Sequence, residues 1–137
     1  MHLYTALIIA QGYNLECAWP IDSLTWSRLV EILGDNPGGC GPGRSGDYLV
    51  PDRIWGLNIK PACLCHDVSY ALGKDIKDKE FADWCFQNNM DLMIEVNTWF
   101  APLKWLRRRR ARTYYRAVCR FGYDLFKGGK INEKKTD

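Results

Sequence analysis

The stretch Cys63-Leu64-Cys65-His66-Asp67-Val68-Ser69-Tyr70 decides how we interpret this sequence. A proline just before it suits a first helical turn and a glycine soon after it ends a helix, so we predict a helix over residues 61–72. His66 and Tyr70 are four residues apart and therefore share a face of that helix, with Asp67 beside them. A buried carboxylate next to a base costs several kcal/mol unless a counter-ion neutralises it, and a calcium ion held by Asp67 would do so.

A glycine-rich loop, Gly39-Cys40-Gly41-Pro42-Gly43, precedes this helix within a stretch too rich in Gly and Pro for regular structure. Alternate glycines let backbone carbonyls turn toward a cation, and carbonyl oxygens suit calcium. Zinc is the competing metal, because Cys63, Cys65 and His66 are thiolate and imidazole ligands. On a helix, however, Cys65 points away from the other two, and no second ligand pair with finger-like spacing follows.

Helical spacing of apolar residues predicts the rest of the fold. A short polar connection over residues 74–78 leads to a second long helix over residues 79–97, which favours antiparallel packing against the first. We also expect a helix over residues 24–33, a short hairpin within 47–60 and a third long helix over 103–126. The apolar face of that third helix would hold Ala111, Tyr114, Val118, Phe121 and Leu125. The sequence thus predicts a mainly α domain over residues 1–127 and a flexible polar tail over 128–137.

The net charge of +3 hides a strong asymmetry. Residues 1–103 hold 7 Lys and Arg against 13 Asp and Glu, whereas residues 104–120 hold 8 basic residues and no acid. Such a segment suits an anionic partner, either a lipid surface or a nucleic acid, although a solvated helix face is the simpler explanation. The run Arg107, Arg108, Arg109 and Arg110 is the candidate membrane interface, since each basic residue near an anionic bilayer contributes about 1 kcal/mol.

Six tryptophans are many for a chain of 137 residues. Some suit a lipid headgroup boundary, but we expect core packing for at least half of them. No apolar run reaches the length needed to cross a bilayer, so we predict no transmembrane segment. The apolar start lacks a basic region, which argues against a signal peptide, and the localisation stays open, with secretion or release among the alternatives.

Three motifs in order carry a family resemblance: Gly39-Cys-Gly-Pro-Gly43, His66-Asp67-x-x-Tyr70 and Ala82-Asp83-x-x-Phe86. Together they resemble the calcium loop, the active-site helix and the second catalytic helix of phospholipase A2 enzymes. The segment Tyr114-Tyr115-x-Ala-Val118-x-x-Phe-Gly122 is similar to the late helix of the short bacterial members. The resemblance covers residues 37–126 and is nearest to the short bacterial, phage or parvovirus type.

The resemblance implies calcium-dependent hydrolysis of the sn-2 acyl ester of glycerophospholipids at a bilayer or micelle surface. His66 would be the general base that activates a water, and Asp83 would fix its tautomer. Tyr70 would donate a hydrogen bond to that carboxylate, and Tyr114 or Tyr115 could reach it too. Asp67 would bind Ca2+ together with the carbonyls listed here: Gly39, Gly41 and Gly43. Asp78 is an alternative candidate for the role given to Asp83. We prefer Asp83, because Asp83 belongs to the apolar stripe of its helix.

The cysteines depart from the pattern of the secreted animal enzymes. Only Cys40 and Cys63 match positions that are bridged there, so the resemblance implies a single Cys40–Cys63 disulfide. The alternative is that all six thiols are reduced, as in a cytoplasm.

Two other function classes stay open beside the lipolytic enzyme. A basic nucleic-acid-binding module would use the arginine-rich helix to follow phosphates, but it has no need of His66, Asp67 or the glycine loop, and nucleic acid is the weaker prediction. A catalytically silent structural protein could keep the same fold.

Overall fold

The computed structural model describes residues 1–34 and 51–135, with the side chains of 124, 125 and 127–135 left out. Its elements are α1 (Leu3–Tyr13), the 3-10 helix η1 (Ile21–Ser23), α2 (Trp26–Leu33), β1 (Arg53–Ile54), β2 (Leu57–Asn58), α3 (Lys60–Leu72), α4 (Ile76–Asn97) and α5 (Ala101–Lys135). The predicted mainly α class is confirmed. None of the described helices is both long and apolar enough to span a bilayer.

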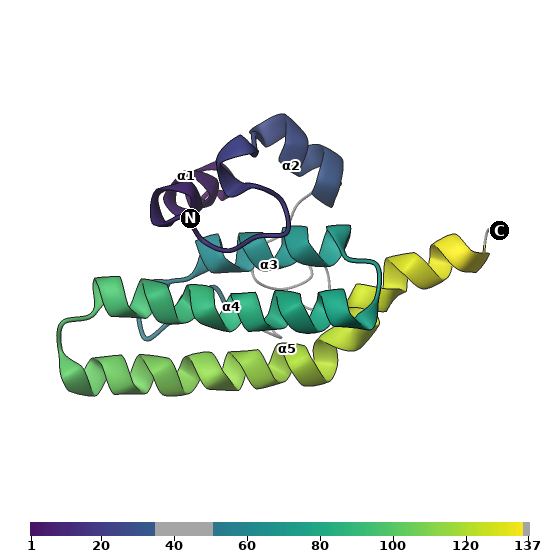
Figure 1. Ribbon diagram of the computed structural model, residues 1–137. Helices are drawn as coiled ribbons and strands as arrows, with labels where there is room; N and C mark the ends of the chain where they lie inside the picture. The colour runs from purple at the N-terminus through teal and green to yellow at the C-terminus, as the bar shows by residue number, and fades with distance from the viewer. Residues whose placement is uncertain (35–50, 136–137) are drawn as a thin grey trace.

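Helix α3 occupies the centre of the fold. It lies against α4 on one side and against α1 and α2 on the other, while α5 packs on α4 (Figure 1). Eight of its thirteen residues are buried, including His66. The chain reverses after α3 so that α4 runs antiparallel to it, as the short connection predicts (Figure 1).

Helix α4 begins three residues earlier than the predicted start at Lys79. Asp75 is the N-cap, and its side chain accepts from the Asp78 N–H at 3.0 Å. The Asp78 side chain in turn accepts from the Asp75 N–H at 3.3 Å, which completes a capping box. Asp78 therefore has a local role at the start of the helix.

Helix α1 was not predicted. Leu3, Ala6, Leu7 and Ala10 are buried and recur at helical spacing, but the segment carries no acidic residue in its first turn and no basic residue in its last. The prediction missed it because the capping and charge signals that mark a helix end are weak here.

Helix α5 is longer than predicted at both ends and continues past Gly128 and Gly129 to Lys135. Glycine inside a helix costs only about 1 kcal/mol, and no proline follows. Ala111, Tyr114 and Val118 are buried as expected, whereas Phe121 is 59% exposed, so its predicted place on the buried face is wrong. The side chain of Leu125 lies outside the described part of the chain.

The short hairpin between α2 and α3 contacts α5. Arg53 pairs with Asn58 and Ile54 with Leu57, and the turn between them needs a positive φ at Trp55 (46°) and Gly56 (83°). Ile54 is fully buried, and the Tyr114 hydroxyl donates to the Arg53 carbonyl at 2.8 Å. This bond fixes the hairpin against the middle of α5.

Candidate active site

His66 and Asp83 meet between α3 and α4. The His66 Nε2 lies 2.7 Å from the Asp83 Oδ1, and both side chains are buried. Their helical positions explain the contact, since both belong to the stripes by which the two antiparallel helices face each other. Asp83, and not Asp78, is thus the carboxylate beside the histidine.

Two more donors bind the same carboxylate. The Tyr70 hydroxyl donates to Asp83 Oδ1 at 2.6 Å, and the Lys79 ammonium donates to Oδ2 at 2.6 Å. Lys79 also donates to the backbone carbonyls of Val118 (3.1 Å) and Cys119 (3.5 Å) on α5. A buried lysine whose three N–H groups all have acceptors is well satisfied, and it links the site to α5.

Lys79 was not predicted as part of the site. The signal in the sequence was its position four residues before Asp83, a spacing that brings a lysine and a carboxylate together on one helix. The expected second tyrosine does not take this place. The Tyr114 hydroxyl donates to the hairpin, and Tyr115 interacts with the Cys119 thiol.

The three donors determine the charge of Asp83. Burial raises its pKa, but the hydrogen bonds from His66, Lys79 and Tyr70 outweigh burial and leave the pKa below its usual range. Asp83 is therefore a carboxylate at neutral pH. Burial, followed by the bond to this carboxylate, raises the pKa of Tyr70, so its hydroxyl stays a donor.

His66 is neutral in the resting protein. Burial lowers its pKa most strongly, the bond to Asp83 raises it, and the Lys79 ammonium lowers it again, with a net decrease. Since Asp83 accepts the Nε2 proton, the lone pair of the neutral ring is on Nδ1. The ring is held between Phe86, stacked at 4.6 Å, and Tyr70, tilted at 4.1 Å. An oriented imidazole with a basic Nδ1 is suited to accept a proton.

Asp67 is half-buried on α3, directly after His66. Burial raises its pKa well above the ordinary value, and a second carboxylate, Asp52, raises it further. A hard oxygen ligand in such a place fits calcium. The other predicted ligands, the carbonyls of Gly39, Gly41 and Gly43, lie outside the described residues.

The structure shows which of the described cysteines form a disulfide bond. Cys63 is disulfide-bonded, while Cys17, Cys65, Cys85 and Cys119 are free. Cys40, the expected partner of Cys63, lies outside the described residues, so the pairing stays a prediction. Within 1–34 and 51–135 no group of three or more His, Cys, Asp or Glu side chains is placed to hold a metal ion, and the zinc candidates Cys63, Cys65 and His66 form none.

The predicted membrane residues lie near the start of α5, and two of them have polar partners. Arg107 donates to Thr98 and to the Trp55 carbonyl, and Arg108 pairs with Glu95. Arg109 and Arg110 are exposed.

Comparison of the chain with models of known families, with curated proteins and with solved structures found no match. The resemblance to phospholipase A2 therefore rests on the sequence motifs.

The Lys79 ammonium should contribute to the lowered pKa of His66. We expect Lys79→Met to raise the pKa of His66, because the Asp83 charge would then act on the imidazole alone. The pKa can be measured by NMR titration of the ring protons, with Lys79→Gln as a second variant that keeps a hydrogen-bond donor. Lys77→Met removes an exposed charge from the same helix and should leave the pKa unchanged. An unchanged or lower pKa in both Lys79 variants would contradict the assignment.

Gly122 packs closely against the Tyr70 hydroxyl, so a side chain at this position should disturb the hydrogen bond from Tyr70 to Asp83. A Cβ on Gly122 would lie 2.6 Å from the Tyr70 hydroxyl oxygen, so Gly122→Ala should cost about 1–3 kcal/mol of unfolding free energy by overpacking. Gly12→Ala on α1, where a Cβ meets nothing within 4 Å, should instead stabilise by up to about 1 kcal/mol. Urea unfolding measures both. In a Tyr70→Phe background the cost at Gly122 should largely disappear, and an equal cost in both backgrounds would refute the clash.

Proposed function

We propose that this protein is a calcium-dependent, phospholipase A2-like enzyme that hydrolyses the sn-2 acyl ester of glycerophospholipids. The observation that carries the proposal is the buried pair of His66 and Asp83, joined at 2.7 Å, with the proton-accepting nitrogen of His66 left as Nδ1. The sequence resemblance supplies the substrate class, and the site chemistry agrees with it.

The reaction needs a base and a way to stabilise the protonated base. As a water attacks the ester carbonyl carbon, His66 Nδ1 takes its proton. Asp83 stabilises the imidazolium through Nε2, while Tyr70 and Lys79 hold the carboxylate in position. When the tetrahedral intermediate collapses, the C–O bond to the glycerol breaks and the proton passes from Nδ1 to the departing glycerol oxygen.

Asp67 would hold the calcium ion, together with the carbonyls of Gly39, Gly41 and Gly43 that the resemblance implies. A bound calcium ion would supply the positive charge that stabilises the oxyanion of the tetrahedral intermediate, while His66 acts as the base. Asp67 follows His66 directly on α3, so the helix fixes the separation between base and ligand.

The other two classes explain less of the structure. A nucleic-acid-binding module requires the basic surface of α5 but not a buried histidine with a perturbed pKa. A silent structural protein could use the same network for stability alone, and loss of catalysis in a folded His66 variant distinguishes it from an enzyme.

Release of fatty acid tests the proposal directly. With a phospholipid labelled in the sn-2 chain, we expect calcium-dependent release of labelled fatty acid and a loss of about 10²–10⁴-fold in His66→Gln, because the general base is removed. His2→Gln is a matched control, since His2 is the only other histidine and caps α1. Equal activity of His66→Gln and the wild type, or release that persists in excess chelator, would reject the mechanism.

Calcium binding can be tested without catalysis. We expect calcium to raise the thermal midpoint of the wild type but not of Asp67→Asn, whose activity should also be abolished. Without calcium, Asp67→Asn should be at least as stable as the wild type, because a raised folded-state pKa means that the charged form destabilises the fold at pH 7.

Asp91→Asn is the control for that experiment, since Asp91 is another half-buried carboxylate whose pKa burial raises. Its response to calcium should match the wild type. A calcium-induced shift that survives in Asp67→Asn would place the ion elsewhere.

A further inference from the structure

Four aromatic side chains are exposed around the turn between α4 and α5 and on the hairpin beside it. Trp99 is 92% exposed, Trp105 59%, Trp55 51% and Phe100 51%. The expectation that at least half of the tryptophans lie in the core is wrong, because no tryptophan among the described residues is buried. Exposure of so much aromatic surface in one region indicates a contact with another apolar phase.

Arg107 holds these segments together. Its guanidinium donates to the Thr98 hydroxyl in the turn at 2.7 Å and to the Trp55 carbonyl in the hairpin at 2.9 Å. The three segments that carry the aromatic residues therefore have fixed relative positions. Arg107 acts here as a structural tie.

Two neighbouring arginines pair with two of the tryptophans. The Arg109 guanidinium carbon lies 5.4 Å from the centre of the Trp105 ring, and that of Arg110 lies 5.7 Å from the centre of the Trp55 ring. Each pair places a cation over the ring of an exposed indole. We call these six residues the Arg–Trp surface: Trp55, Trp99, Phe100, Trp105, Arg109 and Arg110.

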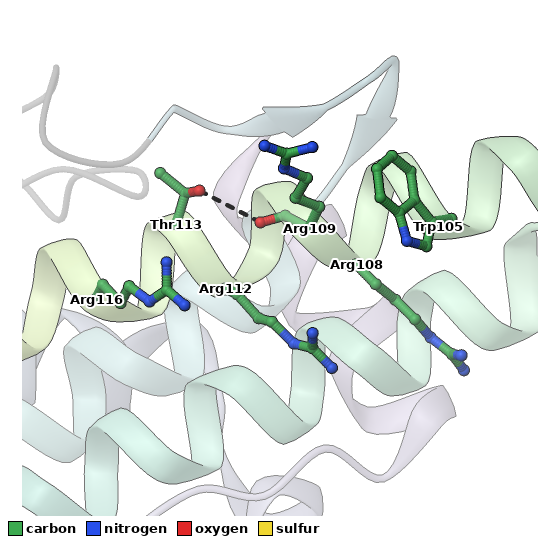
Figure 2. A pocket seen from close by; sticks show the side chains of 6 residues that line it. All are labelled: Trp105, Arg108, Arg109, Arg112, Thr113 and Arg116. Carbon is green, nitrogen blue, oxygen red and sulfur yellow. Dashed lines mark hydrogen bonds between the residues drawn. The ribbon is translucent and has the colours of Figure 1, made fainter.

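A shallow groove of about 500 Å³ extends the positive charge along α5. It is lined by Trp105, Arg108, Arg109, Arg112, Thr113 and Arg116, which recur at helical spacing on one face (Figure 2). In Figure 2 the guanidinium groups spread apart, with Arg108 and Arg112 on the side of α4 and Arg109 turned toward the hairpin. Glu95 of α4 forms an ion pair with Arg108, and the charge of Asp91 interacts with the charges of Arg108 and Arg112. Arg109 and Arg116 therefore remain available to bind an anion outside the protein.

We infer that the Arg–Trp surface docks this protein on a membrane that contains anionic phospholipids. Arginines that spread apart suit many separate headgroup phosphates in a plane better than one phosphate bound by converging donors. Exposed indoles beside them match the headgroup boundary, where tryptophan partitions favourably. This inference rests on the proposed function in one respect: a lipolytic enzyme has its substrate in that membrane.

The surface also has a physical connection to the candidate site. The hairpin that carries Trp55 begins directly after Asp52, and the Asp52 carboxylate acts on Asp67. The Asp52 carbonyl accepts from the Ile59 N–H at 2.7 Å, which closes the base of the hairpin. The hairpin that carries Trp55 also leads directly into α3, the helix that carries the proposed calcium ligand.

Vesicle binding tests this inference. The probe is His66→Gln protein, which should not hydrolyse the lipid, mixed with vesicles of phosphatidylcholine alone or with 30% phosphatidylglycerol added. We expect binding that requires the anionic lipid and that weakens about thirtyfold in Arg109→Gln/Arg110→Gln, from about a fivefold loss per charge.

A matched control removes equal charge elsewhere. Arg28→Gln/Lys77→Gln also deletes two cations, and Arg28 lies 4.4 Å over the Trp19 ring, so it loses a similar cation–π pair. Binding should be nearly unchanged in this control. An equal loss in both double variants would show attraction by net charge only and would overturn the docking surface.

Insertion of the tryptophans gives a second, independent readout. Bromine-labelled lipids should quench part of the protein fluorescence, and Trp105→Phe or Trp55→Phe should reduce the quenched fraction. Trp84→Phe should not, although Trp84 is also 51% exposed, because it stacks on Phe81 of α4 and is not part of the Arg–Trp surface. Quenching that depends on Trp84 instead would place the membrane contact on α4.

The outcomes separate docking from catalysis. If vesicle binding fails while a monomeric short-chain phospholipid is still hydrolysed, the docking surface is wrong and the proposed function stands. If binding follows the predicted pattern and no lipid is hydrolysed, the proposed function fails and the surface stands. Oligonucleotide binding that is lost in Arg109→Gln/Arg110→Gln, without vesicle binding, would assign the surface to nucleic acid and overturn the inference.

Discussion

The buried carboxylate of Asp83 is the constraint on which the rest of the structure depends. It is 1% exposed and accepts hydrogen bonds from His66, Tyr70 and Lys79, which come from α3 and α4. A buried charge left without its partner costs about 3–5 kcal/mol, so all three donors must be in place for the helices to pack as they do. Lys79 extends the requirement to α5 through the Val118 and Cys119 carbonyls.

The division of charge within this group also sets the chemistry that it supports. Lys79 offsets the negative charge of Asp83, so the resting site needs no protonated histidine and His66 stays neutral. The same ammonium makes an imidazolium less favourable, whereas the 2.7 Å bond to Asp83 makes it more favourable. Burial lowers the pKa of His66 most, and two groups four residues apart on one helix adjust it in opposite directions, so exchange of either one would change it.

The sequence predicted those parts of the site that depend on local spacing. The helices around His66 and Asp83 follow from apolar periodicity, and their antiparallel contact follows from a short connection. Lys79 was missed because a lysine near the start of a helix normally lies in solvent, and its burial depends on carbonyl groups about forty residues further along the chain. The number of exposed tryptophans was underestimated for a similar reason: composition shows that they are apolar, but only the fold shows which of them the core covers.

The contacts of Lys79 also imply an order of assembly. The His66–Asp83 bond joins residues 17 positions apart, whereas the bond from Lys79 to the Val118 carbonyl spans 39 positions. Local contacts form before distant ones, and domains gain structure as the ribosome releases them. A nascent chain that ends before α5 can pair α3 with α4, but its lysine ammonium is still hydrated. The site is completed only when the C-terminal helix has been synthesised, so truncated chains would be less stable and would lack the acceptors of Lys79 on α5.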